Sequence, residues 1–341
     1  MDHERGLLGL IIARLGGRLG KFSYREKLLL CESFNTEREL LRQSAEDIEA
    51  LIGRKLASHW DLDTMYWLAE RDAERARLKG INWVSWYSSA YPPLLREIYD
   101  PPIVLFFKGN LPNPEAPLAA IVGTRKPSPQ SAAQSYRIAH DLARSGVSVI
   151  SGLALGIDGM AHRGNIEGGA PTVAVLGSGL DNVYPSSNRP LARRILETGG
   201  CLLSEYPPGT GPRKWNFPAR NRIISGLARG VLIVEAPEKS GALITARFAL
   251  EHNREVWVAA CGLAEDDGQK AAGGKTAFDR KGSTRLAADG AGIIRDASDI
   301  LEAWDMETTG LEMPEIASGV SASSGLALAA SLAHSLDVPL E

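Results

Sequence analysis

Short apolar runs alternate with helical stretches through the middle of the chain, from residue 118 to 305. The runs are rich in Val, Ile and Ala and do not alternate with polar residues, which is typical of strands buried on both faces of a sheet. They lie at 118–122, 147–150, 172–176, 201–203, 231–235 and 255–259. Helical patterns follow near 130–144, 157–167, 190–198, 219–228 and 243–252. The alternation predicts an α/β fold with an extended Rossmann-like, doubly wound and mostly parallel sheet.

The regions on either side of this core have other patterns. Residues 1–80 carry Leu and Ile at helical spacing, with capping sequences at Thr36 and Ser44, and they predict a small helical domain. Residues 81–117 contain paired prolines and predict a linker with a lead-in strand. Residues 306–341 hold five acids and neither Lys nor Arg, which predicts an acidic flexible tail.

Composition narrows the function classes. The net charge of −3 gives no global basic signature, so any nucleic-acid surface must be local. The three cysteines are far apart and have no metal-ligand spacing, which favours a reducing, cytoplasmic setting without a metal site. No apolar segment reaches the length of a membrane span. We therefore expect a soluble cytoplasmic protein.

The first strand of the core runs into a turn suited to phosphate. Gly123 allows a tight turn, and Arg125 supplies a forked, permanently charged donor. Ser128 is placed as an N-cap with Pro129 in the first helical position, so free backbone amides would face an anion here. Taken alone, the motif fits an ordinary turn with a solvated arginine equally well.

Glycine-bearing turns also follow the later strands of the predicted sheet, at Ser151–Gly152, at Gly177 and at Ser240–Gly241, where Ser240 is placed as an N-cap. Asp158 and His162 lie four residues apart on the helix after the second strand. We interpret them as a structural pair that orients the turn, because no nucleophile or third metal ligand accompanies them. Since the carboxyl ends of parallel strands share one edge, these turns are expected to converge there.

The segment between Tyr206 and Val234 concentrates positive charge. It has five cationic residues, no acid, and the interleaved aromatics Trp215 and Phe217. Bases stack on aromatic rings and phosphates pair with cations, so this combination favours single-stranded nucleic acid. The alternative is a basic helix that packs by its aromatic side chains. The cations are Arg213, Lys214, Arg220, Arg222 and Arg229.

Together these motifs resemble the DprA/Smf DNA-processing family, in order and over residues 118–260. The matching segments are Gly123–Arg125, Ser151–Ala154 with Gly156–Asp158, Ala174–Gly177, Tyr184–Pro185, Ser204–Glu205, Phe217–Ile224, Val234–Glu235 and Ser240–Thr245. The resemblance implies a Rossmann-like domain that binds single-stranded DNA, forms a homodimer and helps to load the RecA recombinase during natural transformation. It also implies a sterile-alpha-motif-like fold for residues 1–80.

Carried over onto this chain, the resemblance makes Arg125 the main phosphate-binding arginine. The predicted nucleic-acid site comprises Gly123, Thr124, Arg125, Ser151, Gly152, Gly177, Arg189, Phe217, Arg220, Asn221, Arg222, Ser240 and Gly241. Arg189 stands near the place where many members have a lysine, and Cys261–Gly262 and Gly282–Arg285 depart from the family's pattern. We expect no winged-helix domain after residue 305, and neither catalytic residues nor a cofactor.

Two other functions remain open at this stage. A nucleotide-binding or nucleotide-hydrolysing enzyme would use similar glycine turns, and Glu205 and Glu235 are the best-placed acids for it. The absence of a GxGxxG motif and of paired carboxylates weighs against that function. A protein-interaction scaffold built on the N-terminal helices is the third possibility.

Overall fold

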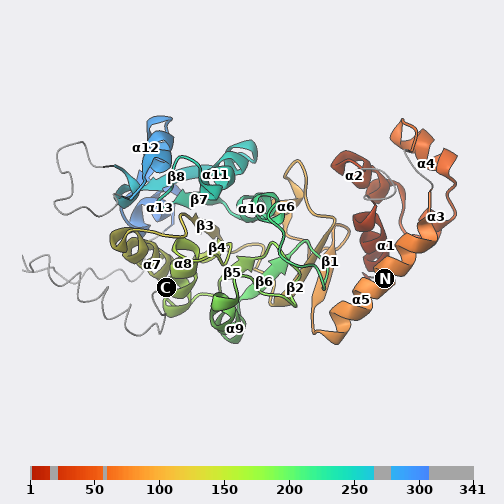
Figure 1. Cartoon of the computed structure of the whole chain (residues 1–341), viewed down its shortest axis with the longest axis horizontal. Coiled ribbons are helices and arrows are strands. Elements are labelled where there is room, and N and C mark those ends of the chain that lie inside the picture. The colour runs from red at the N-terminus through yellow and green to blue at the C-terminus, as the bar shows by residue number, and fades with distance from the viewer. Residues whose placement is uncertain (1, 16–21, 57–59, 265–277, 307–341) are drawn as a thin grey trace, which may run out of the picture.

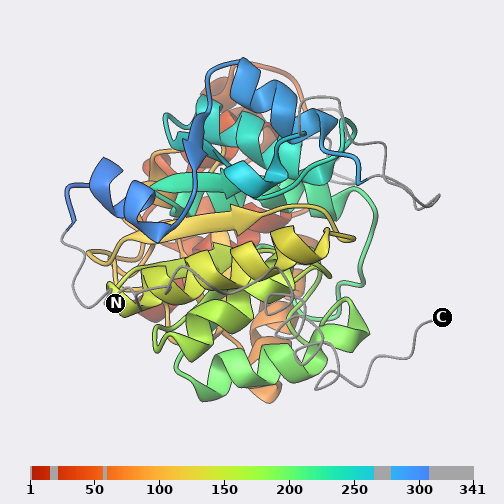
Figure 2. The ribbon, with the colours of Figure 1, turned by 90° about the vertical axis from the view of Figure 1, so that its left-hand side faces the viewer.

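The computed structural model describes residues 2–15, 22–56, 60–264 and 278–306. Within these ranges nine strands form one sheet, and helices cover both of its faces (Figures 1 and 2). The predicted α/β, Rossmann-like and mostly parallel architecture is confirmed. The expected acidic tail lies outside the described residues apart from Met306, as does part of the chain between Cys261–Gly262 and Gly282–Arg285.

The sheet has the order β1-β2-β6-β5-β4-β3-β7-β8-β9. Seven strands, from β6 to β9 across the sheet, are parallel: β3 Leu118–Val122, β4 Ser148–Ser151, β5 Val173–Val175, β6 Cys201–Ser204, β7 Gly230–Ile233, β8 Glu255–Ala259 and β9 Gly292–Ile294. The chain winds outward from β3 in one direction as far as β6, and then returns to place β7 on the other side of β3. Ligands of such sheets bind at this switch point, beyond the carboxyl ends of the strands.

Two antiparallel strands extend the sheet beyond β6. β1 (Asn82–Ser85) pairs with β2 (Val104–Gly109), and β2 pairs with β6 in a register that sets Phe106 opposite Ser204. The short helix α6 (Pro93–Arg96) lies between them in the chain, and the buried Tyr91 hydroxyl donates to the Pro102 carbonyl at 2.7 Å. The segment predicted as a linker with a lead-in strand therefore contributes two strands to the main sheet.

Helices pack on both faces of the sheet (Figure 2). One face carries α7 Pro129–Arg144, α8 Ile157–Glu167, α9 Arg189–Glu197 and α13 Ala297–Ala303. The other face carries α10 Asn216–Leu227, α11 Gly241–Glu251 and α12 Lys281–Ala288. The strands between them are buried almost throughout, which explains their non-alternating sequences.

The N-terminal part of the chain is helical, as its periodicity predicts. Its helices are α1 Asp2–Arg14, α2 Tyr24–Ser33, α3 Glu37–Leu41, α4 Ala45–Ile52 and α5 Leu62–Leu78. The predicted caps are confirmed: Thr36 accepts from the Glu39 amide, and Ser44 forms a capping box with Asp47. None of the described helices is long and apolar enough to cross a membrane.

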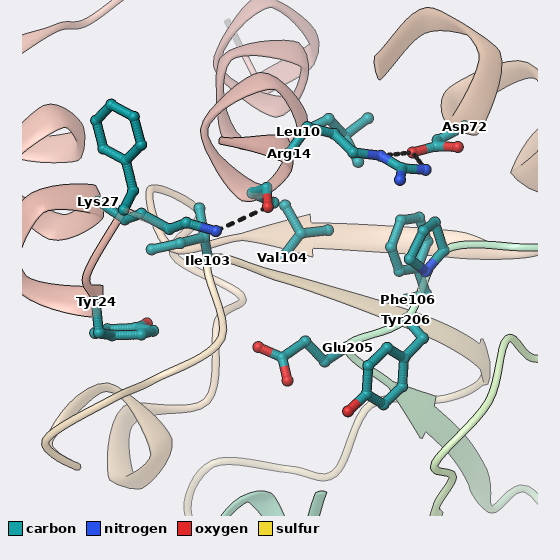
Figure 3. Close-up of a pocket in the computed structure, with 13 residues that line it drawn as sticks. Leu10, Arg14, Tyr24, Lys27, Asp72, Ile103, Val104, Phe106, Glu205 and Tyr206 are labelled. Atoms are coloured by element: carbon teal, nitrogen blue, oxygen red, sulfur yellow. Dashed lines mark hydrogen bonds and ion pairs between the residues drawn. The ribbon is translucent and has the colours of Figure 1, made fainter. Parts of the chain in front are cut away.

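These helices pack directly against the antiparallel edge of the sheet (Figure 1). Gly9 of α1 lies so close to β1 that a Cβ atom on it would stand 2.6 Å from the Cβ of Ser85. A cavity of about 360 Å³ remains between α1, α2, α5, β2 and the loop after β6 (Figure 3). Arg14 forms an ion pair with Asp72 beside it, and Lys27 donates to the Ala13 carbonyl at 2.9 Å.

Candidate nucleic-acid groove

A groove of about 620 Å³ lies at the switch point of the sheet, between the strand ends of β3 and β7 and the start of α10. It is lined by the turn after β3, the turn after β7 and the first two turns of α10, with the segment after β4 at one side. The residues that matter for its chemistry are Gly123, Thr124, Arg125, Asp158, Tyr184, Lys214, Phe217, Arg220, Asn221, Lys239, Ser240 and Gly241. The predicted convergence of strand-end turns is therefore present.

The turn after β3 is held by backbone contacts on both sides. The Thr124 amide donates to the Glu235 carbonyl at 2.8 Å, and the Ile157 amide donates to the Thr124 carbonyl at 3.2 Å. Gly156 has a φ of +76°, and a Cβ there would stand 2.5 Å from the Thr124 carbonyl oxygen. Only glycine fits this left-handed, crowded position easily. The turn is thus fixed, while Arg125 remains exposed at the groove.

Glu235 anchors the helix that follows this turn. Its carboxylate is 1% exposed, accepts the Ser128 hydroxyl at 2.7 Å and the Ser128 amide at 3.3 Å, and lies 3.6 Å from the Arg280 guanidinium. Ser128 in turn accepts from the Ser131 amide as the predicted N-cap of α7. Glu235 is not among the residues that line the groove, so its geometry is that of a structural anchor.

The turn after β4 is built around Arg220. The Ser151 hydroxyl donates to the Ile121 carbonyl at 2.6 Å, which joins the ends of β4 and β3 behind the groove. A Cβ on Gly152 would stand 2.1 Å from Nη1 of Arg220, so the missing side chain makes room for this guanidinium. Arg220 is buried and donates to the Val175 carbonyl at 2.6 Å. Burial lowers the pKa of Arg220 to about 10; the charge of Asp158 opposes this shift, and the charge of Arg125 contributes to it.

Asp158 and His162 do not pair with each other. Asp158 accepts the backbone amides of Gly152 at 3.1 Å and Ala154 at 3.3 Å, so it orients the turn alone. Burial raises the pKa of the Asp158 carboxyl, while the charge of Arg220 and these amides oppose the rise. His162 instead lies 2.8 Å from the Thr172 hydroxyl, and burial lowers its pKa to about 3. The structural interpretation of Asp158 is supported, but the expected pairing is wrong because the two side chains bind different neighbours.

The start of α10 brings aromatic rings to the groove. The rings of Phe217 and Tyr184 are 5.5 Å apart at an angle of 47°. Gly177 lies beneath them, where a Cβ would stand 3.0 Å from the Phe217 ring. The Asn216 amide donates to the Gly177 carbonyl at 3.0 Å and fixes the helix start to the end of β5. An open aromatic surface of this kind suits the face of a planar base.

The turn after β7 closes the other side of the groove. Ser240 is the N-cap of α11 and accepts from the Ala242 amide at 3.2 Å, as predicted. Asn221 reaches across from α10 and donates to the Gly241 carbonyl at 3.1 Å. Lys239, immediately before the cap, lines the groove. A helix N-terminus beside a lysine forms a favourable place for a phosphate group.

Tyr184, Lys214 and Lys239 are among the lining residues that lie outside the predicted site. The sequence holds a signal for each, since Lys214 belongs to the basic segment, Tyr184 to the Tyr–Pro motif, and Lys239 directly precedes an N-cap. Their contribution depends on which way a loop side chain points, which neither periodicity nor motif spacing specifies.

Five predicted residues are not among those that line the groove. Gly152 and Gly177 lie against the side chains of Arg220 and Phe217, Ser151 is fully buried, and Arg189 is exposed at the start of α9. Arg222 points to the opposite side of α10, where it forms ion pairs with Glu205 at 2.6 Å and Asp100 at 2.9 Å. Burial alone would lower the pKa of Arg222, but these two carboxylates raise it above its usual value.

The described residues offer no site for metal chemistry, because no three His, Cys, Asp or Glu side chains among them are placed to hold an ion. The two acids considered for an enzyme are both engaged elsewhere. Glu205 pairs with Arg222, and Glu235 binds Ser128 and Arg280.

Comparisons with known proteins place the chain in a family. Residues 82–305 match the family profile of DNA recombination-mediator protein A. Protein Smf from Synechocystis is 50% identical over 171 residues, which cover 49% of this chain and 43% of that protein. The chain thus aligns with less than half the length of this curated relative.

Solved structures agree with the fold. DNA processing protein A from Streptococcus pneumoniae superposes with a TM-score of 0.68 and 31% identity, covering 90% of this chain and 99% of that one. DNA processing protein A from Helicobacter pylori, which was studied for its single-stranded DNA binding mode, gives a TM-score of 0.56 and 27% identity over 66% of this chain and 98% of that one. From the profile match and these similarities, the chain belongs to the DNA recombination-mediator protein A family, the DprA/Smf family of DNA-processing proteins.

Proposed function

We propose that this protein binds single-stranded DNA in the groove between β3, β7 and α10 and acts in DNA recombination as a mediator rather than as an enzyme. The observation that carries the proposal is the lining of the groove, where the cations Arg125, Lys214 and Lys239 surround the aromatic pair Tyr184 and Phe217. The similarity of the chain to DNA processing protein A from Helicobacter pylori supports single-stranded DNA as the ligand.

The two kinds of side chain would recognise different parts of the strand. Phosphates would be bound by Arg125 and the lysines, with the amides at the start of α11 adding partial positive charge. Bases would stack on Phe217 and Tyr184. Because stacking and phosphate contacts carry little sequence information, binding should depend weakly on sequence.

The remaining family expectations become proposals for this chain. We propose that it forms a homodimer and that it delivers single-stranded DNA to the RecA recombinase in the cytoplasm. We further propose the division into a helical unit at 1–80, a lead-in at 81–117 and a DNA-binding unit at 118–305, with a tail beyond it. The matched family profile begins at residue 82, which supports including the lead-in strands with the DNA-binding unit.

An Arg125→Ala variant tests the groove directly. Its affinity for a dT oligonucleotide should fall about tenfold at low salt, since one charge-assisted contact contributes roughly 1.5–3 kcal/mol. The slope of log K against log salt concentration should become shallower by about 0.7, the amount expected for one lost phosphate contact on a single strand. Fluorescence anisotropy over a salt series measures both quantities.

Arg247→Ala is the matched control, because Arg247 is an exposed arginine of α11 that pairs with Glu251 and does not line the groove. The control should bind like the wild-type protein. Equal affinity and equal salt slope for Arg125→Ala and wild type would refute the assignment of the groove.

A further inference from the structure

Helix α5 of the N-terminal region has an exposed surface that divides by charge. With about 100° per residue, Trp67, Arg71, Arg75 and Lys79, the last at its C-cap, follow one another around one side of the helix. Asp63, Glu70 and Glu74 follow from Trp67 in the opposite direction around the helix, together with Arg77, which is paired to Glu74 at 2.7 Å. Trp67 thus lies at the border between an acidic side and a basic side, and the basic side holds Arg71, Arg75 and Lys79.

The aromatic and basic members of this side already contact each other. The Arg71 guanidinium lies 5.0 Å from the centre of the Trp67 ring, and the Trp67 side chain is 57% exposed. The exposed indole offers a large flat surface on which a planar group can stack. An arginine stacked beside an open aromatic face is an arrangement that binds bases and phosphates together.

The basic side of α5 faces the loop that leads to the groove. Asp72, at its inner border, lines the cavity of Figure 3 with Tyr206, and its pairing with Arg14 holds α5 against α1. Arg71 lies 3.9 Å from the same carboxylate, but the closer contact with Arg14 already neutralises Asp72, so Arg71 keeps its charge for a ligand. Arg75, one turn further along, reaches the same loop, since a Cβ on Gly209 would stand 3.1 Å from its Nη1. The position of α5 relative to the groove is therefore set by direct contacts.

The loop itself continues the same chemistry up to the groove. Arg213 lies 5.7 Å from the centre of the Trp215 ring, and Trp215 is 68% exposed. Lys214, between them, lines the groove. One arginine–tryptophan pair thus lies on α5, whose Arg75 approaches Gly209, and another lies on the loop that follows Gly209.

We infer that Trp67, Arg71 and Arg75 of α5 form a second subsite for single-stranded DNA, which takes up the strand where it leaves the groove past Trp215. This inference rests on the proposed function of the groove and adds the N-terminal helical region to the DNA path. The span from residue 67 to residue 75 is about 12 Å of helix, which is enough to meet more than one nucleotide. A short oligonucleotide fills the groove alone, and a longer one also reaches α5.

A length series of dT oligonucleotides, from about 5 to about 30 nucleotides, separates the two subsites, since single-strand site sizes lie within this range. The double variant Arg71→Ala/Arg75→Ala should bind the shortest oligonucleotides like wild type. It should bind the longest about tenfold more weakly, with a salt slope shallower by about 1.4 for two lost phosphate contacts. Trp67→Ala should weaken only long oligonucleotides, about 5-fold or more, with little change in slope.

Arg77→Ala on the acidic side of α5 is the matched control and should bind every length normally. Arg75→Glu is a second probe, which keeps the ion pair between Arg71 and Asp72. Thermal unfolding followed by circular dichroism verifies that each variant is folded. If Arg125→Ala weakens all lengths while the α5 variants bind every length like wild type, the α5 subsite is refuted and the groove stands. If wild type binds no oligonucleotide, both proposals fail.

Discussion

The groove and the junction with the N-terminal helices both contain arginines, but their electrostatics are opposite. At the groove, Arg125, Lys214 and Lys239 form no ion pair with any side chain in the described ranges, and the charge of Arg125 acts on Arg220. At the junction, Arg222 lies between Glu205 and Asp100. Arg220 and Arg222 are two residues apart on α10, so one helix separates the two environments.

The difference shows how to tell a ligand-binding cation from a structural one. A cation with buried acidic partners is already neutralised and has little charge left for a phosphate. Cations that gather without acids raise the local potential and attract an anionic strand. A run of basic residues in a sequence contains both kinds, and only the partners distinguish them.

The largest effect is expected at the junction. Arg222→Ala should lower the free energy of unfolding by about 3 kcal/mol, because it leaves two carboxylates without their cation. This lies at the low end of the range for buried pairs, since Glu205 and Asp100 keep 27% and 34% of their side-chain surface in water. Urea denaturation measures the loss, with Arg247→Ala as a control that should stay within about 0.5 kcal/mol of wild type.

The same variant should keep its DNA affinity under conditions where it is folded. If folded Arg222→Ala binds DNA as weakly as Arg125→Ala, the contrast between the two arginines fails. Arg222 would then belong to the nucleic-acid site that was predicted from the sequence.

A second test compares two glycines of the predicted site. Gly152→Ala should cost about 1–3 kcal/mol of stability, since the new methyl group meets the buried Arg220 guanidinium at 2.1 Å. It should also weaken DNA binding, because Arg220 lines the groove. Gly241→Ala should be neutral in stability to within about 0.5 kcal/mol, since no heavy atom lies within 4 Å of the added Cβ. If both variants lose equally little stability, the Arg220 guanidinium moves aside from the new methyl group at no measurable cost.

The smallest effect concerns pH. Burial, and then the charge of Arg220, lower the pKa of His162 from 6.5 to about 3, so the unfolded chain takes up a proton that the folded protein does not. The free energy of unfolding should therefore fall as the pH drops below 6.5, by up to about 1.4 kcal/mol per pH unit for this residue. His252, with a pKa lowered to about 4 by burial, acts in the same direction.

The raised pKa of Asp158 acts in the opposite direction above pH 3.8, so the useful window is about the first pH unit below 6.5, where His162 begins to titrate in the unfolded chain. Urea denaturation across this window should give a shallower pH dependence for His162→Asn than for wild type. An unchanged slope would mean that His162 takes up its proton at nearly the same pH in the folded protein as in the unfolded chain.

Much of the core fold could be predicted from the sequence. Strands buried on both faces leave uninterrupted apolar runs, and β3 was expected at 118–122, where it is found. Caps also leave local signals, which explains why Ser44, Ser128 and Ser240 were identified as helix starts. These features depend on neighbours in the chain.

Other features depend on partners far away in the chain and could not be predicted. Nothing near Arg222 in sequence reveals Asp100, which is 122 residues away. β1 is only partly buried at the edge of the sheet, so it lacks the apolar run that marks the inner strands. Asp158 and His162 have the spacing of a helical pair, but hydrogen bonds to the β4 turn and to Thr172 replace that contact.

The link between Ser128 and Glu235 joins residues 107 positions apart, and it has a consequence for the newly made chain. A ribosome adding about 5–20 residues per second needs roughly 5 to 20 s to pass from one to the other. During that time the turn that carries Arg125 has neither its anchor nor the opposite wall of the groove, because β7 and α11 do not yet exist. The groove can therefore form only after translation has passed α11, which keeps incomplete chains from holding single-stranded DNA.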